Sequence, residues 1–331
     1  MLFRSLRNHL DPERYQEIQA TVVDINRNDH GITSLQLDNG TVIAGDVFID
    51  CTGFKKLLIG SMTDFVPHPK LLNNAAVWGQ VKGYNSDRPS TVSTAQQCGW
   101  IWEIPTWGQM GSGHVYCNEF ATEQQAIDTI SQYWEKQGFV WYHDKSVKFQ
   151  SGRLREIACG NVIANGLGQS FIEPLEATSI MITCVTAINI SKVYNKHKSW
   201  DSKSSKLLST YMDRFIESTM EFVSAHYTLS DRCDTEYWRA YDRRGALELV
   251  SSLIEQQFNR GWAAPDETTL NGYNWTNMLI GYNKPYLGKL PVFSQEQLDN
   301  YEFYTSQLME NYRWLYRNNK TIAQRLKEIH E

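Results

Sequence analysis

A segment near the middle of the chain combines residue types that suit an anion site. Gly166 and Gly168 follow a short apolar run, and residues 171–180 read F-I-E-P-L-E-A-T-S-I. Glycines let a backbone approach a ligand closely, and the helix expected from about Glu176 presents free N–H groups at the positive end of its dipole. This arrangement suits a bound anion. The plainer alternative is a helix N-terminus with acidic residues in its first turn.

Residues 100–105, W-I-W-E-I-P, form the second unusual pattern. A strand would place Trp100 and Trp102 on one face. Pro105 would end the strand pairing because it has no N–H to donate. Two indoles on one face are large enough to block a passage. The plainer alternative is an aromatic edge strand that packs in a core.

The elements that must position these residues divide the chain into a β-rich first half and a helical second half. Alternating or apolar runs predict strands over residues 18–25, 32–37, 41–44, 47–54 and 161–164, with a tight turn at Asp38-Asn39-Gly40. One helix is expected at 122–137, and the second half predicts helices over residues 180–198, 203–228, 234–241, 243–260 and 295–317. The fold class is therefore α+β.

Composition excludes several classes of protein. With 331 residues, 41% of them hydrophobic and 21% charged, the chain has the balance of a globular protein. A net charge of −5 argues against a nucleic-acid surface. None of the six cysteines forms a C-x-x-C pair, so we expect no metal site. Several of them lie inside apolar runs, as buried free thiols do, so we expect a reducing, cytoplasmic location. The sequence contains no run of about eighteen apolar residues, so we expect no membrane span. No apolar stretch follows the basic start, so we expect no signal peptide.

The two motifs resemble the signatures of flavin-dependent halogenases, the tryptophan halogenase family. Residues 46–54, D-V-F-I-D-C-T-G-F, resemble a third segment of that family, and the resemblance covers essentially the whole chain. It implies a partial FAD-dependent, p-hydroxybenzoate-hydroxylase-like flavin module that is rich in strands. It also implies a mostly helical C-terminal half. We expect residues 1–185 to form the remaining flavin and halide-site module, and residues 186–331 to form a helical domain on the substrate side.

The resemblance assigns roles to individual residues. Glu176 matches the catalytic glutamate at the substrate end of a tunnel, while Thr178 and Ser179 match the pair that holds the halide. Cofactor-binding positions implied by the resemblance are Asp50, Gly53, Gly166, Leu167 and Ile180. The tunnel barrier corresponds to Trp100, Trp102 and Pro105. His226 is interpreted as a structural histidine rather than a base.

The implied activity is regioselective halogenation of tryptophan or another electron-rich aromatic. It uses reduced FAD, O2 and halide, and the implied partners are a separate flavin reductase and a small aromatic substrate. The sequence departs from the family because it contains neither the G-x-G-x-x-G fingerprint nor the segment with the catalytic lysine. We assign that role to neither Lys55 nor Lys56. We therefore expect the C-terminal part of a halogenase, with a separately encoded N-terminal half and a homodimer as candidate assemblies.

Two other readings stay open at this stage. One is a flavin-dependent aromatic monooxygenase, which would share the β-rich module. The other is a non-catalytic truncated homologue or partner subunit, which would expose an apolar patch. The mass of the product separates the first alternative from a halogenase, and the absence of bound flavin would mark the second.

Overall fold

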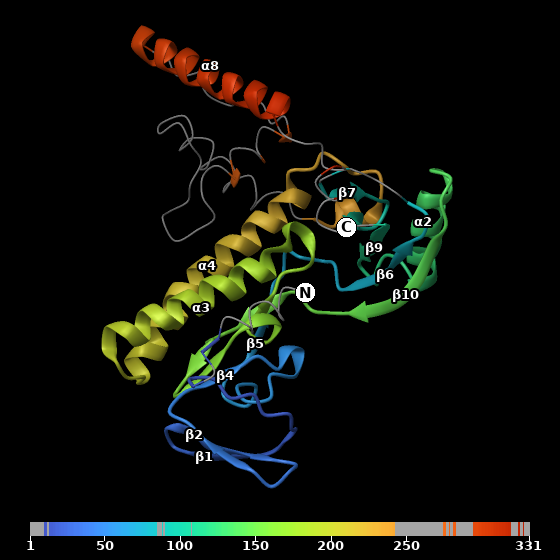
Figure 1. The fold of residues 1–331 in the computed structure, drawn as a ribbon. Helices are drawn as coiled ribbons and strands as arrows, with labels where there is room; N and C mark the ends of the chain where they lie inside the picture. The colour runs from blue at the N-terminus through green and yellow to red at the C-terminus, as the bar shows by residue number, and fades with distance from the viewer. Residues whose placement is uncertain are drawn as a thin grey trace. The chain divides into compact units, whose positions relative to one another are not determined.

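The computed structural model describes residues 10–11, 13–84, 88, 90–106, 108–241, 274–275, 278, 281–282, 294–318, 324 and 327. The chain forms two compact units, and each unit is assembled from three separate segments (Figure 1). The first unit takes residues 1–64, 155–169 and 186–210, and the second takes residues 65–154, 170–185 and 211–331. The division at residue 185 expected from the sequence concerns function, and it stays a prediction.

The first unit contains the first three strands that the sequence predicts. Strands β1 (Val22–Asn28), β2 (Gly31–Leu37) and β3 (Val42–Ala44) form an antiparallel sheet in that order. The turn between β2 and β3 contains Gly40, whose φ of 82° favours glycine. The first strand begins at Val22, later than the predicted residue 18.

A second sheet of the same unit brings two glycine turns together. Strand β4 (Phe48–Asp50) pairs in parallel with β13 (Val162–Ala164), and β13 pairs antiparallel with β12 (Ala158–Cys159). A 3-10 turn follows each parallel strand: η1 (Gly53–Lys55) follows β4, and η2 (Gly166–Gly168) follows β13. The two turns lie at one edge of the sheet, since the carboxyl ends of parallel strands meet there.

The second unit is built on a five-stranded antiparallel sheet in the order β10-β6-β9-β8-β7. Helix α2 (Glu123–Glu135) lies against β6, β9 and β10 and buries Ala126, Ile130 and Trp134. Thr122 caps this helix, as the predicted start requires. The strands are β6 (Ala75–Val81), β7 (Val92–Ala95), β8 (Trp100–Thr106), β9 (Gln109–Tyr116) and β10 (Trp141–Lys148).

The W-x-W strand lies inside this sheet rather than at its edge, because β8 pairs with both β7 and β9. The prediction that Pro105 ends the pairing is wrong. Pairing with β7 stops at Glu103, whereas pairing with β9 continues through Pro105 to Thr106. A proline removes a donor toward one neighbour only, and beyond Glu103 the strand has a single neighbour in the sheet.

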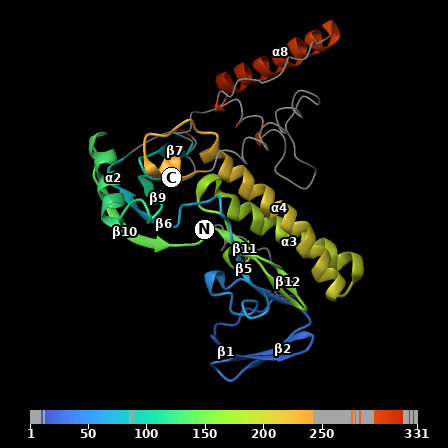
Figure 2. The ribbon, with the colours of Figure 1, turned by 180° about the vertical axis from the view of Figure 1, so that it is seen from behind.

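A small sheet carries the chain toward the predicted anion site. Its order is β14 (Ser170–Phe171), β11 (Gly152–Leu154) and β5 (Phe65–Pro67), and Figure 2 labels β5 and β11. Arg153 on β11 contacts Asp213 at 2.9 Å and Glu217 at 2.8 Å. Both acids belong to the second unit, so this pair of contacts fixes the sheet to the helix that carries them.

The helical second half agrees with the sequence in its main elements. Helix α3 begins at Thr178, two residues after the expected start, and the predicted helix at 234–241 is short. The helix expected at 243–260 lies outside the described residues. The helices are α3 (Thr178–His197), α4 (Ser202–Thr228), α5 (Glu236–Arg239) and α8 (Gln295–Asn318).

One helical stretch in the described part of the chain meets the length and composition of a membrane span. Residues Leu175–His197 reach a mean hydropathy of 1.2, and 22% of the 18-residue window is buried. A single stretch of this kind is weak evidence, because core helices of soluble proteins have the same composition. Thr186, in its middle, is fully buried and exchanges hydrogen bonds with Gln169 at 2.9 and 3.0 Å.

Candidate active site

A strained turn precedes helix α3, and the first two residues of that helix are those predicted to hold the halide. Strand β14 leads through Pro174 into the 3-10 turn η3 (Leu175–Ala177). Glu173, Glu176 and Ala177 have φ angles of 119°, 64° and 50°. Three non-glycine residues in this region within five positions require strong support from their surroundings. Glu176 therefore lies in the turn and not in the helix.

The hydroxyls of Thr178 and Ser179 are available to an anion. Both side-chain oxygens are buried, and neither has a hydrogen-bond partner among the described residues. They stand in the first turn of α3, where backbone N–H groups lack helical partners. Ile180, the next residue, is 71% exposed. A buried hydroxyl without a partner at a helix N-terminus can donate a hydrogen bond to a bound ligand. A halide ion is an acceptor that fits this position.

Glu176 is paired with His226. The Oε1 atom of Glu176 lies 3.4 Å from Nε2 of His226, and Nδ1 of His226 lies 3.0 Å from the carbonyl oxygen of Phe222. Since Nδ1–H donates to that carbonyl, Nε2 can donate to Glu176 only when the ring is protonated. The hydrogen bond from His226 lowers the pKa of Glu176 against the effect of partial burial. The carboxylate is thus held in its charged form.

An open pocket of about 520 Å³ lies beside this pair. Glu176 and His226 line one wall of it, and Tyr282 donates to the carbonyl oxygen of His226 at 2.6 Å. The described residues of the pocket are Glu176, Phe222, His226, Asn274, Met278, Gly281 and Tyr282. Aromatic walls and one carboxylate suit a flat, uncharged substrate.

Glu173 is the centre of a buried polar cluster that the sequence did not reveal. Its side chain is 1% exposed and accepts from Nε1 of Trp100 at 3.2 Å, from Nδ2 of Asn73 at 3.2 Å and from the hydroxyl of Tyr227. Tyr237 donates to Oδ1 of Asn73 at 3.0 Å. Burial raises the pKa of Glu173 to about 7, although the three donors oppose this shift. Burial also raises the pKa of Tyr227, so its hydroxyl stays a donor.

The two indoles of the W-x-W motif lie on the same side of β8, as the strand period predicts. Their ring centroids are 6.0 Å apart and the rings are tilted by 57°. Trp100 is buried, while Trp102 is partly exposed. Trp102 lies over Gly113 of β9, where an added Cβ would come within 2.1 Å of the indole. The glycine therefore makes room for the second indole.

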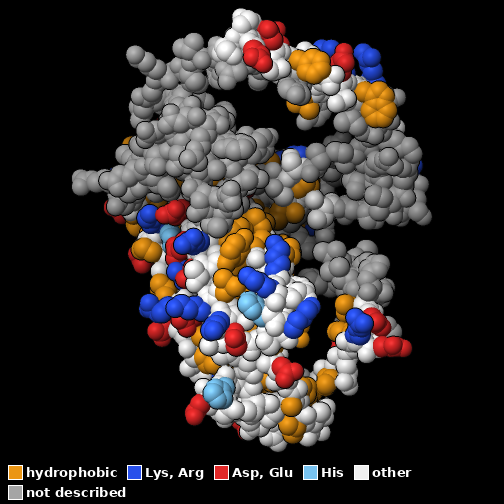
Figure 3. Space-filling view, turned by 90° about the vertical axis from the view of Figure 1, so that its left-hand side faces the viewer, with side chains coloured by type: hydrophobic (Ala, Val, Ile, Leu, Met, Phe, Trp, Pro, Cys, Tyr) orange, Lys and Arg blue, Asp and Glu red, His pale blue; other side chains and the backbone are white. Residues whose placement is uncertain are grey.

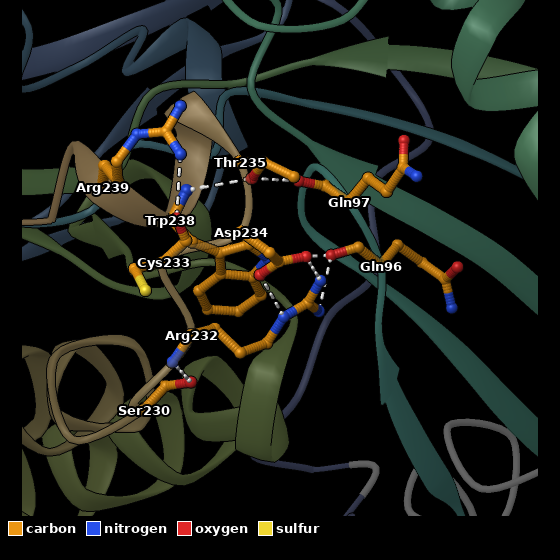
Figure 4. Close-up of polar contacts among 9 residues, drawn as sticks. All are labelled: Gln96, Gln97, Ser230, Arg232, Cys233, Asp234, Thr235, Trp238 and Arg239. Carbon is orange, nitrogen blue, oxygen red and sulfur yellow. Dashed lines mark hydrogen bonds and ion pairs between the residues drawn. The ribbon is translucent and has the colours of Figure 1, made fainter.

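A clamp of polar contacts holds the loop that leads into Trp100 (Figure 4). Arg232 donates to the carbonyl oxygen of Gln96 at 2.8 Å, and Nε1 of Trp238 donates to the same oxygen at 2.8 Å. Arg232 also pairs with both carboxylate oxygens of Asp234 and lies 4.7 Å from the ring centre of Trp238. Thr235 donates to the carbonyl oxygen of Gln97 at 2.8 Å. The segment after α4 thus fixes the start of the W-x-W strand.

In the first unit the predicted cofactor residues surround the two glycine turns. Gly53 and Gly166 have φ angles of 66° and 74°, and an added Cβ would meet nothing within 4 Å at either position. At Gly168 an added Cβ would lie 2.9 Å from the carbonyl oxygen of Gly53. Leu167 is 38% exposed beside them. Open backbone next to an exposed apolar side chain fits the edge of a flat ring system.

Asp50 supports these turns through its own loop. Its carboxylate accepts from the backbone N–H and the hydroxyl of Thr52 and from the backbone N–H groups of Leu58 and Ile59, at 2.6–3.0 Å. These hydrogen bonds outweigh burial and lower the pKa of Asp50. All its acceptor capacity is used internally, so its effect on a cofactor would pass through the position of the loop.

The comparisons with known proteins agree with this geometry. The tryptophan halogenase family model matches residues 4–289. The chain belongs to the tryptophan halogenase family. No group of three metal-ligating side chains occurs in the described part of this halogenase-family chain.

Curated members of the family match the chain over part of their own length. A tryptophan 6-halogenase, ThaL, from Streptomyces albogriseolus is 32% identical over 262 residues, which are 76% of this chain and 48% of that protein. A tryptophan 7-halogenase, RebH, from Lentzea aerocolonigenes is 31% identical over 254 residues, which are 73% and 46% of the two chains. The chain thus spans about half the length of these halogenases.

Solved structures of the family share the fold. A flavin-dependent halogenase from Xanthomonas campestris has a TM-score of 0.80 at 22% identity and covers 97% of this chain and 66% of its own. BrvH, a flavin-dependent halogenase from Brevundimonas sp. BAL3, has a TM-score of 0.79 at 24% identity, covering 99% and 68%. The mixed α+β architecture predicted from the sequence is that of flavin-dependent halogenases.

Proposed function

We propose that this chain supplies the halide site and the substrate side of a flavin-dependent halogenase. The enzyme would halogenate tryptophan or another electron-rich aromatic regioselectively, with reduced FAD, O2 and halide. One observation carries the proposal: the charged Glu176 precedes by two residues a helix start with buried, unpartnered hydroxyls. An anion site and a carboxylate on one short turn match what aromatic halogenation needs.

Thr178 and Ser179 would hold the halide. Their hydroxyls and the first N–H groups of α3 are donors without helical acceptors, and the helix dipole favours an anion at this end. Because donors of this kind contact an ion through its charge, the site would accept either chloride or bromide.

Glu176 would act as the base. Replacing hydrogen by halogen on an aromatic ring releases a proton, and a nearby carboxylate can take it. The aromatic ring that has gained a halogen and still holds its hydrogen is a strong acid. A carboxylate with a lowered pKa is therefore basic enough to remove that proton. His226 keeps the carboxylate charged and turned toward the pocket.

Trp100, Trp102 and Pro105 would form the barrier between the halide side and the substrate side. The two indoles lie on one face of β8 at a centroid distance of 6.0 Å. Glu173 and the clamp around Arg232 hold Trp100 in place, which suits a wall that must not move.

FAD would bind at the glycine turns of the first unit. Gly53, Gly166 and Leu167 would contact it, and Asp50 would hold the supporting loop. Ile180, in the second unit, stays a cofactor-binding residue by prediction. When bound, reduced FAD supplies the electrons that activate O2, and a separate flavin reductase would deliver it in that form.

All six cysteines are free, which supports the proposed cytoplasmic location.

We further propose that the pyrophosphate cradle and the catalytic lysine come from an N-terminal halogenase segment, which a separate chain can provide. Helix α3 supports this, since Ile180, Ile188 and Tyr194 are 71%, 53% and 46% exposed. Figure 3 shows hydrophobic side chains open to solvent beside lysines and arginines on one face. A second copy of this chain, giving a homodimer, is the competing occupant of such a surface.

A product assay tests the proposal. The chain, with the N-terminal segment of a family member added in trans, is incubated with FAD, a flavin reductase, NADH, bromide and an indole. Mass spectrometry should find a product with the isotope doublet of bromine. An oxygenated product would instead support an aromatic monooxygenase. The absence of both products, together with no flavin binding, would support a non-catalytic partner protein.

A further inference from the structure

One buried carboxyl is not used by the proposed chemistry. Glu173 is 1% exposed and lies three residues before Glu176. Its donors come from distant parts of the second unit: Trp100 from β8, Asn73 from the segment before β6, and Tyr227 from α4. A buried carboxyl with three donors of this kind joins elements that the chain order keeps apart.

The turn that follows Glu173 needs an anchor. Glu173 itself has a φ of 119°, and Glu176 and Ala177 also lie in the left-handed region. Backbone of this kind persists only where surrounding contacts fix it. Within the turn the described backbone hydrogen bonds include one from Ala177 to the carbonyl oxygen of Pro174 at 3.0 Å. The side chain of Glu173 adds the buried contacts that tie the turn to the sheet.

Trp100 is a rigid point for that anchor. The loop before it closes through a hydrogen bond from the backbone N–H of Gln96 to the carbonyl oxygen of Gly99 at 2.8 Å. Arg232 and Trp238 hold the carbonyl oxygen of Gln96 from the other side. The indole N–H of Trp100 therefore presents a fixed donor to Glu173.

We propose that Glu173 is a positioning residue. It fixes the turn that carries Glu176 and leads into Thr178 and Ser179 against the first indole of the W-x-W pair. The inference rests on the proposed function, which assigns the base and the halide site to this turn and to the start of α3. Glu173 touches neither substrate nor cofactor in this arrangement, because its side chain is enclosed by Trp100, Asn73 and Tyr227.

A carboxyl suits this task better than an amide. Its two oxygens receive three donors, and the Oε1 atom alone receives both Trp100 and Tyr227. In Glu173→Gln one end of the side chain becomes a donor, so at least one of the three partners would face another N–H. The substitution keeps the volume and replaces one acceptor by a donor, which isolates the positioning role.

The test compares backbone hydrogen–deuterium exchange in the full chain, its Glu173→Gln variant and its Glu103→Gln variant. Glu103 is a matched control: it is 4% exposed, lies on the same strand as Trp100, and accepts from a tyrosine hydroxyl and from Arg88. E173Q should speed exchange over residues 173–180 by about tenfold or more, and E103Q should leave that segment unchanged. Equal exchange over 173–180 in the two variants overturns the proposal.

A spectroscopic signal separates positioning from a general loss of stability. The 15N-labelled indole N–H of Trp100, assigned by its absence in Trp100→Phe, should move in E173Q and stay in place in E103Q. An indole signal that E173Q leaves in place overturns the proposal. If E173Q does not fold, W100F, which removes the indole N–H together with part of the ring and keeps the carboxyl, should still loosen residues 173–180; unchanged protection there overturns the proposal. These readouts need no flavin or substrate, so a failed halogenation assay does not affect them.

Discussion

The indole N–H of Trp100 donates to Oε1 of Glu173 over 3.2 Å, and this contact joins the W-x-W strand to the turn before α3. Seventy-three positions separate the two residues in the sequence. One buried carboxyl therefore contacts the W-x-W strand, which is the predicted tunnel barrier, and belongs to the turn that leads into the predicted halide site. Changes at that carboxyl should affect both motifs together.

The pH dependence of stability should carry the signature of Glu173. Burial raises its pKa from 4.5 to about 7, so between these values the folded protein keeps a proton that the unfolded chain has released. Stability must then fall as the pH rises through this window and level off above it. Relative to E173Q, the wild type should lose roughly 3 kcal/mol across the window, at about 1.4 kcal/mol for each pKa unit.

Urea unfolding of both proteins at several pH values between 4.5 and 8 measures this difference. His226 opposes the raised pKa of Glu173 by Coulomb attraction, and this residue is present in both proteins. A constant difference in stability at all pH values would show that Glu173 does not titrate in this window.

Replacing His226 should raise the pKa of Glu176. In His226→Phe the hydrogen bond that lowers this pKa is lost and partial burial remains, so Glu176 should titrate at higher pH. Carbon-13 NMR of the labelled glutamate carboxyl, assigned with Glu176→Gln, measures the change. His143→Phe, on the exposed strand β10, is the control and should leave the Glu176 titration unchanged. Identical titration curves in the wild type and H226F would contradict the pairing.

The clamp before Trp100 should depend on Arg232 more than on Asp234. Arg232→Met removes the hydrogen bond to Gln96 and the contact with the Trp238 ring, and should reduce the free energy of unfolding by about 1–3 kcal/mol. Asp234→Asn weakens an ion pair whose acid is 55% exposed, so its cost should stay below about 1 kcal/mol. Chemical unfolding of the two variants checks the ranking, and an equal loss would place the energy in the ion pair.

Gly113 should be intolerant of a methyl group, and Gly111 on the same strand should accept one. An added Cβ at Gly113 would lie 2.1 Å from the Trp102 indole and 2.6 Å from the carbonyl oxygen of Val77. At Gly111 the nearest atom would be 3.7 Å away. Gly113→Ala should cost about 1–3 kcal/mol and shift tryptophan fluorescence, since overpacking displaces the ring. Equal stability of the two alanine variants would show that Trp102 does not lie over Gly113.

Local patterns predicted the parts of the fold that depend on near neighbours in the sequence. The strand period placed Trp100 and Trp102 on one face, and the Asp38-Asn39-Gly40 signal located a turn. The prediction for Pro105 was wrong because a strand can pair on two sides. The sequence does not show on which side a strand lacks a neighbour. The start of α3 was displaced because the positive φ angles at Glu176 and Ala177 override the preference of E-A-T-S for a helix.

The buried cluster at Glu173 lay beyond local reasoning. Its partner Tyr227 is 54 positions away and Asn73 is 100 positions away, so no spacing rule connects them. The available signal was a glutamate between apolar residues, which must find donors if the fold buries it. The pairing of Glu176 with His226 was missed for the same reason. The sequence predicted a structural role for His226, and the structure places it in contact with Glu176, the predicted base.

The rate of product formation in Glu176→Gln tests the central claim most directly. With the N-terminal segment, flavin, reductase, halide and substrate present, E176Q should make halogenated product at least about a hundredfold more slowly, as loss of a general base requires. Glu135→Gln, an exposed glutamate at the end of α2, should keep the wild-type rate. Equal rates of halogenation in the wild type and E176Q would contradict the assignment of this turn as the active site.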